Sequence, residues 1–485
     1  MHRILSVLLA WSAVAVFAQP QQHLTLDQAI SQAQGRSLSA QASRYDYQTS
    51  RYGYQEYLSS TKPQVTLSAS PLYAHSNHEQ SYNYVSPTGY NLLGTDLTAS
   101  VSQQMQPWGG YFYADTKSIW SELLGDMRSQ YGTDRLWGFT PLRLGYKQDL
   151  LGYNPHKWEK KIEEKNLEHA DRLQAFRLMQ IAEQVTDYYF SYVSSQSYYD
   201  TYRQNYLTTD TLYTIAQKKY LLTTVTKAEL MSIELERLNA KTRQDNALTE
   251  LNNARRSLLS YLQLPDEGQE LELQLPEFPE DLTIDASTVT TRVAQCSPEL
   301  LEYDTQMLET EQQLAQVRRQ KGLAVGLDVS VGVQQYNAHI GDAFRHMKPY
   351  TMAQVSLSIP LYDAQLQKNR EGKARSALET LKLQSREYRR QLEDEAATIY
   401  NSLMTQYRTL PEAHRGSLQA EEAFQLVRQQ YANGLLDSNT YMLAQSRKDE
   451  VRDVYVSLLC NFWMNYYRLC RLTLYDYIND KPLLL

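Results

Sequence analysis

The stretch that decides the fold is residues 323–333, LAVGLDVSVGV. Leu or Val fills every odd position, and Ala, Gly, Asp or Ser fills every even one. This period of two predicts a β-strand with one apolar face and one small or polar face. The same alternation occurs at 353–361, 65–69 and 142–147, so the sequence predicts four such strands.

Four strands have two open edges, which hydrocarbon does not tolerate unless other strands pair with them. The alternative is a small soluble sheet packed on helices. That arrangement would bury Arg143, Lys147 or Asp328 unless their face is solvated. We therefore expect these three residues to line the water-filled lumen of a β-barrel.

The chain contains the same order of signals twice: helix, strand, loop, strand, very long helix, tight turn, helix. In the first copy, Thr25 and Gln28 have capping-box spacing and open a helix that we expect to reach about Thr61. Thr226 and Glu229 have the same spacing and predict the start of the helix after the first tight turn. In the second copy, Pro298 is a first-turn residue, either inside the opening helix or at a restart. The predicted segments are a signal peptide (1–18), the first copy (19–263), a connector (264–286), the second copy (287–480) and a tail (481–485).

Two very long helices follow the strand pairs, at about 155–222 and 364–433. Each would be roughly 100 Å long at 1.5 Å per residue. Their apolar positions have heptad character, so we expect coiled-coil-like packing. Pro411 predicts a kink or short break in the second long helix.

The chain has 485 residues and a formal net charge of −7, which disfavours nucleic-acid binding. A basic start, an apolar run to Phe17 and small residues before Gln19 predict a signal peptide cleaved after Ala18. No later run reaches 18 apolar residues, so any membrane role must use strands. The three cysteines fit ordinary buried thiols.

Matching turns follow the long helices, and we expect them to form tips where the chain reverses direction. The tip residues are Thr223, Thr224, Val225 and Thr226 in the first copy, and Gly434, Leu435, Leu436 and Asp437 in the second. Asp437 fits two roles, an N-cap of the last helix or a ring of charge lining an aperture.

Five segments together resemble the TolC family of outer-membrane efflux channels, and the resemblance covers nearly the whole mature chain. The segments are LTLDQAI (24–30), KPQV (62–65), QDLLGY (148–153), IPLYD (359–363) and YANGL (431–435). The resemblance implies a homotrimer in which four strands per chain close a transmembrane barrel of about twelve strands. The long antiparallel helices would form an α-barrel across the periplasm.

Three features depart from the family pattern. Residues 73–140 separate the first two strands by far more than the second copy does, which predicts an extracellular hairpin extension, with extra barrel strands as the other option. Thr223 stands where the family has Gly. Tyr441 and Ala444 stand where the family has an acidic ring, so Tyr441 joins Asp437 as an expected aperture residue.

No catalytic or metal-binding motif is found in the sequence, so we expect no enzyme activity, cofactor or metal site. The resemblance implies a passive exit duct in the outer membrane, within a tripartite efflux or type I secretion system. Its partners would be a periplasmic adaptor and an inner-membrane transporter. The alternative is a secreted coiled-coil structural or adhesive protein of the cell envelope.

Overall fold

The computed structural model describes residues 23–79, 88–124, 133–151, 153–223, 226–266, 272–279, 281–433, 435–436 and 438–483. The predicted signal peptide therefore lies outside the described residues. The chain divides into two compact units. One contains Met1–Ser43, Ala175–Val289 and Ala396–Leu483, and the other contains Arg44–Gln174, Thr290–Glu395 and the last two residues.

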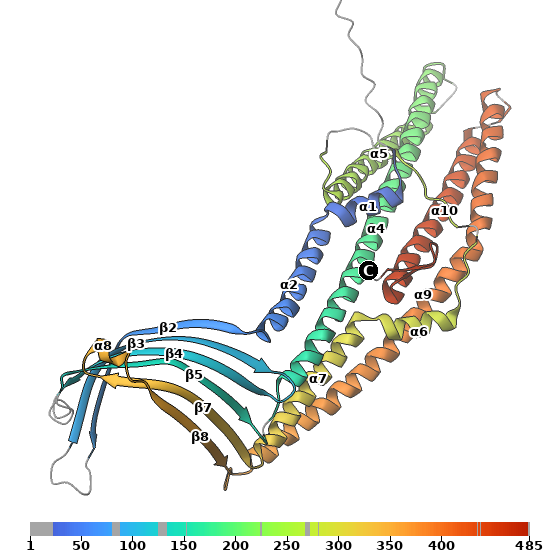
Figure 1. Cartoon of the computed structure of the whole chain (residues 1–485). Coiled ribbons are helices and arrows are strands. Elements are labelled where there is room, and N and C mark those ends of the chain that lie inside the picture. Colours follow the sequence, from blue (N-terminus) through green and yellow to red (C-terminus); the bar gives the residue numbers. More distant parts are fainter. Residues whose placement is uncertain are drawn as a thin grey trace, which may run out of the picture. The chain divides into compact units, whose positions relative to one another are not determined.

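The helices of the two halves match in length (Figure 1). The first half has α1 (Leu26–Arg36, 11 residues), α2 (Leu38–Ser60, 23), α4 (His156–Leu221, 66) and α5 (Lys227–Leu262, 36). The second half has α6 (Ala286–Cys296, 11), α7 (Pro298–Gln320, 23), α9 (Leu366–Ala432, 67) and α10 (Ser438–Thr473, 36). No helix in the described part of the chain has the length and apolarity needed to cross a bilayer.

Serine side chains divide the opening helix of each half. Ser37 accepts a hydrogen bond from the backbone N–H of Ala40 at 3.1 Å, and Ser297 accepts one from that of Leu300 at 3.2 Å. Each serine caps a new helix by satisfying an otherwise unpaired N–H. The prediction of one unbroken helix up to Thr61 is therefore wrong, and the second copy shows the predicted restart.

The predicted capping boxes are confirmed. Thr25 and Gln28 exchange hydrogen bonds at the start of α1, and Thr226 and Glu229 do so at the start of α5. Of the kink or short break expected at Pro411, the structure excludes the break, because α9 continues through this residue. Proline costs a helix interior about 3 kcal/mol. Burial of neighbours such as Leu403 and Leu410, both fully buried, offsets this cost.

Six antiparallel strands form one sheet in the order β2-β3-β4-β5-β7-β8 (Figure 1). They are β2 (Gln64–Glu79), β3 (Thr88–Met105), β4 (Gly110–Leu124), β5 (Arg135–Asp149), β7 (Ala324–Asn337) and β8 (Lys348–Ser358). The short helix α8 (Ile340–Ala343) lies between β7 and β8 in the chain.

The expectation that residues 73–140 form an extracellular hairpin extension is wrong. This segment contributes β3 and β4 to the sheet itself, between β2 and β5, so the two strands predicted as neighbours are not paired. Residues 88–105 and 110–124 alternate in polarity too weakly for the pattern alone to decide between a hairpin extension and extra strands.

A buried tyrosine on α4 is hydrogen-bonded to the connector and to the N-terminal strand that pairs with it. The strands β1 (His23–Leu24) and β6 (Glu272–Leu273) pair in parallel. Tyr189 is fully buried, and its hydroxyl donates a hydrogen bond of 2.8 Å to the carbonyl oxygen of Leu24. The same hydroxyl is within hydrogen-bond distance of the carbonyl oxygen of Gln274. Burial raises the pKa of Tyr189, so the hydroxyl keeps its proton and can donate it.

We expect Tyr189→Phe to weaken the β1–β6 pairing. The change removes the hydroxyl donor that the carbonyl oxygens of Leu24 and Gln274 share, and the loss of one hydrogen bond costs about 0.5–1.5 kcal/mol. Hydrogen exchange of the amides of residues 272–274 should accelerate by about tenfold, the factor that 1.4 kcal/mol gives. Tyr188→Phe is the control on the same helix, because Tyr188 packs by its ring against Tyr261. Equal exchange in both variants would contradict the role of the Tyr189 hydroxyl.

Candidate functional site

The six-stranded sheet has an apolar face that is exposed. Directly opposed residues of neighbouring strands point to the same side of a sheet, so the register assigns each side chain to a face. One row on the apolar face passes through Val65, Val101, Ala114, Leu144 and Val331. Exposed fractions on this face reach 75% at Val65, 72% at Leu67, 67% at Leu357 and 63% at Val355.

The opposite face is polar and more buried. Arg143, Lys147 and Asp328, the residues predicted to line a lumen, all lie on it, and Lys147 is directly opposite Asp328. Ser330 is 1% exposed and Asp115 is 6% exposed on the same face. This distribution is the reverse of a soluble sheet, which buries its apolar side.

An ion pair that the sequence did not reveal crosses the polar face. Arg143 donates two hydrogen bonds of 3.1 and 2.7 Å to the carboxylate of Asp115, which stands on β4. Such charge-assisted bonds fix both side chains. Because β4 was not the preferred prediction for this segment, Asp115 had no predicted neighbour. The available signal was the spacing of two residues that places Tyr113, Asp115 and Lys117 on one face of a strand.

Tyrosine rings cover glycines on the polar face. Tyr113 lies over Gly145 and Tyr336 over Gly138, each pair directly opposed on neighbouring strands. Tyr73 covers Gly94 in the same way. A Cβ at any of these glycines would overlap the ring. Glycine therefore lets a large ring lie flat along the sheet, as in curved sheets where aromatic residues cover glycines.

The turn between β3 and β4 is bonded to the helical ends of its unit. Asn154, which caps the start of α4 through a bond to the N–H of His156, donates to the carbonyl oxygen of Gln106 at 2.9 Å. Gln106 donates to the hydroxyl of Tyr57 on α2 at 3.1 Å. Gln148 on β5 donates to the carbonyl oxygen of Trp108 at 2.9 Å.

The first tip turn departs from ordinary backbone geometry. Thr223 has a φ of 57°, the left-handed conformation that glycine adopts without cost. Thr226 caps α5 beyond it. In the second turn, Leu435 donates its N–H to the carbonyl oxygen of Gln430. The tip residues Thr224, Val225, Gly434 and Asp437 lie outside the described residues, as does the N-cap role expected for Asp437.

Tyr441 is 8% exposed and packs against two aromatic rings. Its ring centroid lies 4.8 Å from that of Tyr431 and 5.6 Å from that of Phe424, both on α9. The Tyr441 ring therefore packs against α9 within the protomer, and its expected aperture role stays a prediction.

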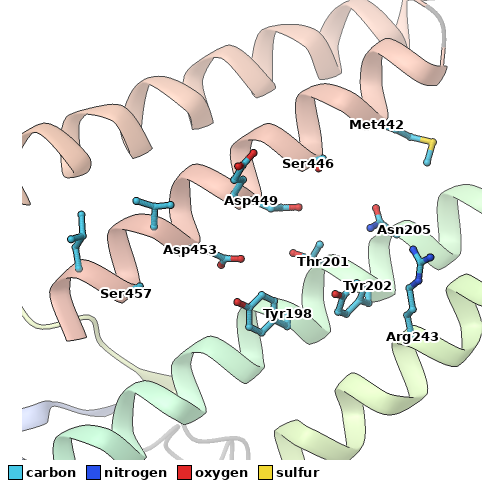
Figure 2. Close-up of a pocket in the computed structure, with 13 residues that line it drawn as sticks. Tyr198, Thr201, Tyr202, Asn205, Arg243, Met442, Ser446, Asp449, Asp453 and Ser457 are labelled. Carbon is cyan, nitrogen blue, oxygen red and sulfur yellow. The ribbon is translucent and has the colours of Figure 1, made fainter. Parts of the chain in front are cut away.

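A groove of about 840 Å³ lies between α4 and α10, with Arg243 contributed by α5 (Figure 2). Figure 2 shows Asp453 on α10 facing Tyr198 on α4, with Asp449 further along α10. Burial, reinforced by the charge of Asp449, raises the pKa of Asp453. The negative charge of Asp453 in turn raises the pKa of Tyr198. These groups lie three or more helical turns from the tip residues, and the sequence analysis did not identify them.

Within the described residues, no group of three or more His, Cys, Asp or Glu side chains is placed to hold a metal ion. The thiols are weakly reactive. Burial raises the pKa of Cys470 to about 12 and that of Cys460 to about 11, which lowers the thiolate fraction at neutral pH. The sheet itself separates an apolar surface from a polar, charged one.

Comparison with solved structures identifies the fold. The chain matches the outer-membrane channel OprN with a TM-score of 0.64 and 12% identity, over 92% of this chain and 89% of that one. It matches the outer membrane protein VceC from Vibrio cholerae with a TM-score of 0.60 and 12% identity, over 92% and 95%. It also matches the CmeC outer membrane channel of Campylobacter jejuni with a TM-score of 0.63 and 10% identity, over 92% and 85%.

No protein-family model matches the chain, and no curated protein does. The three solved structures are nevertheless all outer-membrane proteins. Each match covers 85% or more of both chains. The protein therefore has the fold of outer-membrane channel proteins. The resemblance recognised from the sequence is confirmed at the level of the fold.

We expect Gly145→Ala to impair folding of the sheet, because the added methyl group would overlap the Tyr113 ring. Adding Tyr113→Ala should restore much of the folded yield, since the smaller side chain leaves room for the methyl group. The measurement is the fraction of protein that resists heat dissociation and protease in detergent. A double variant no better than Gly145→Ala alone would contradict the ring-over-glycine contact.

We expect Thr223→Gly to stabilise the first tip turn. A left-handed conformation costs an L-residue roughly 1–2 kcal/mol, and part of this gain is lost to the greater chain entropy of glycine. Amide exchange at the C-terminal end of α4 should slow by a few-fold. Thr226→Ala, which removes a capping side chain at the same turn, should accelerate exchange at the start of α5. Faster exchange in Thr223→Gly would show that the turn gains nothing from glycine.

Proposed function

We propose that the protein is the outer-membrane exit duct of a tripartite efflux or type I secretion system. The observation that carries the proposal is the burial pattern of the sheet: large apolar side chains such as Val65 and Leu357 are exposed on one face, whereas Asp115 and Ser330 are buried on the charged face. Lipid on one side and water on the other would satisfy both faces. The fold shared with solved outer-membrane channels supports the same location.

The sheet edges require more than one copy. Within the described sheet, β2 and β8 each pair with only one neighbouring strand, and they form its two edges. Unpaired backbone groups are too costly in hydrocarbon, so membrane insertion demands closure. A homotrimer, which the family resemblance implies, would pair β8 of each copy with β2 of the next. Arg143, Lys147, Asp328 and Asp115 would then line the lumen.

The long helices extend the duct into the periplasm in this proposal. The equal lengths of α1 and α6, of α2 and α7, and of α5 and α10, with 66 and 67 residues in α4 and α9, support two copies of one structural repeat. Packed side by side in three protomers, the helices would form an α-barrel. No bond is made or broken, and transport energy comes from an inner-membrane transporter joined through a periplasmic adaptor.

The adaptor would dock at the two tip turns, from Thr223 to Thr226 and from Gly434 to Asp437. Both turns join a helix of 66 or 67 residues to one of 36, so they stand at equivalent places in the two halves. Asp437 remains the proposed charge at the aperture, whereas the packing of Tyr441 favours a role within the helix pair.

A secreted coiled-coil adhesin is the competing proposal. It accounts for the long helices but leaves a sheet with a broad exposed apolar face unexplained, and such a face on a soluble protein promotes aggregation. Membrane fractionation separates the two. The duct should require detergent for extraction and should then migrate as a trimer that conducts ions in planar bilayers. A monomer recovered without detergent would overturn the duct.

We expect Val355→Arg to impair membrane assembly far more than Gln354→Arg. Both residues are exposed neighbours in β8, but Val355 lies on the apolar face and Gln354 on the polar face. Arginine facing the bilayer midplane costs about 2–4 kcal/mol, and less near the interfaces. The measurement is the amount of trimer in outer-membrane fractions. Equal amounts for both variants would contradict the assignment of faces.

A further inference from the structure

We propose that the β3–β4 hairpin is part of the channel wall, so that three copies close a barrel of eighteen strands, six from each copy. This inference rests on the proposed function and specifies its pore. The family resemblance alone implies about twelve strands. The alternative for the hairpin is a position outside the wall, with β2 paired directly to β5.

Backbone pairing places the hairpin within the sheet. The β3 register runs along β2 from Gln64↔Ser102 to Glu79↔Thr88, with one irregularity. On the other side, β4 pairs with β5 from Tyr111↔Lys147 to Glu122↔Arg135. Moving the hairpin out of the wall would break both ladders, and the backbone groups on β2 and β5 would need new partners.

Side chains on the polar face bond the hairpin to both flanking strands. Thr66 on β2 and Ser100 on β3 share a hydrogen bond of 2.7 Å between their hydroxyl groups. Asp115 on β4 forms an ion pair with Arg143 on β5, and the Asp115 side chain is 6% exposed. Loss of the hairpin would remove the carboxylate whose charge-assisted hydrogen bonds fix the position of the Arg143 guanidinium.

In the row through Val65 and Leu144, the apolar face continues across the hairpin. Val101 of β3 and Ala114 of β4 occupy the row between Val65 of β2 and Leu144 of β5. Phe112 lies two residues before Ala114 on the same face of β4, directly opposite Tyr146. The two ring centroids are 4.6 Å apart. An extension projecting into water would gain nothing from this alignment, whereas a wall strand facing lipid requires it.

The turn of the hairpin is fixed at the end of the sheet nearest the helices of its unit. Gln106 and Trp108 receive hydrogen bonds from Asn154 and Gln148, and Gln106 bonds in turn to Tyr57. The hairpin thus spans the sheet from this end to the far end, as a wall strand must. Its strands of 18 and 15 residues exceed the 9–11 residues that cross a bilayer.

Closure with six strands is geometrically allowed. An even number leaves β8 antiparallel to β2 of the next copy, which is the arrangement of outer-membrane barrels. Barrel diameter grows roughly in proportion to strand number, so eighteen strands give a wall about 1.5 times as wide as twelve. A barrel of this size holds an aqueous channel, so the membrane end of the duct would not be its narrowest point.

The test uses the full chain as a purified trimer. Electron cryo-microscopy in nanodiscs should show eighteen strands in the wall. Independently, Thr66→Cys with Ser100→Cys should form an intrachain disulfide in outer-membrane fractions, whereas either single variant should not. A variant lacking residues 80–132 joins β2 directly to β5, and its wall should be about two-thirds as wide.

The outcomes separate this inference from the proposed function. A trimeric membrane channel with a twelve-stranded wall, and no disulfide between positions 66 and 100, would overturn the eighteen-stranded barrel and leave the duct intact. A protein that forms no membrane trimer would overturn both. If the deletion variant does not fold, the strand number and the disulfide in the full chain still decide.

Discussion

Every backbone N–H and C=O group of a sheet needs a partner, and this sheet has two edges to which no other strand of the described residues pairs. Strand β2 has β3 on one side only, and β8 has only β7. In water the open edges would invite aggregation, and in a bilayer they would be prohibitively costly. The rest of the molecule is consistent with one resolution, the closure of the sheet by further copies of the chain.

The side chains on the two faces follow from the same constraint. A closed barrel in a membrane has hydrocarbon outside and water inside, so its strands must carry apolar and polar residues alternately. A soluble sheet would bury Val65 and Leu357 and expose Asp115 and Ser330, whereas this sheet does the reverse. In a barrel, the two apolar residues would face lipid and the two polar residues would face the lumen. Glycines beneath tyrosine rings let the sheltered face carry large side chains on a curved sheet.

Much of this architecture was accessible from the sequence because strong periodicity and caps report local structure directly. The alternation at 323–333 predicted β7, and Thr25 and Thr226 marked helix starts that the structure confirms. The face shared by Arg143, Lys147 and Asp328 also followed from period two. The role of β3 and β4 did not, because strand pairing is a long-range choice that a weak local pattern cannot decide. Asp115 and the groove beside Tyr198 depend on such tertiary contacts.

The single insertion of a hairpin has a structural consequence for how such a wall can vary. A closed antiparallel sheet keeps its alternating strand directions only if strands are added or removed in pairs. The pair β3–β4 lies between β2, which follows α2, and β5, which precedes α4. Under three-fold symmetry, circumference therefore changes in steps of six strands. Because only the first half carries the extra pair, the arc between α2 and α4 holds four strands while that between α7 and α9 holds two.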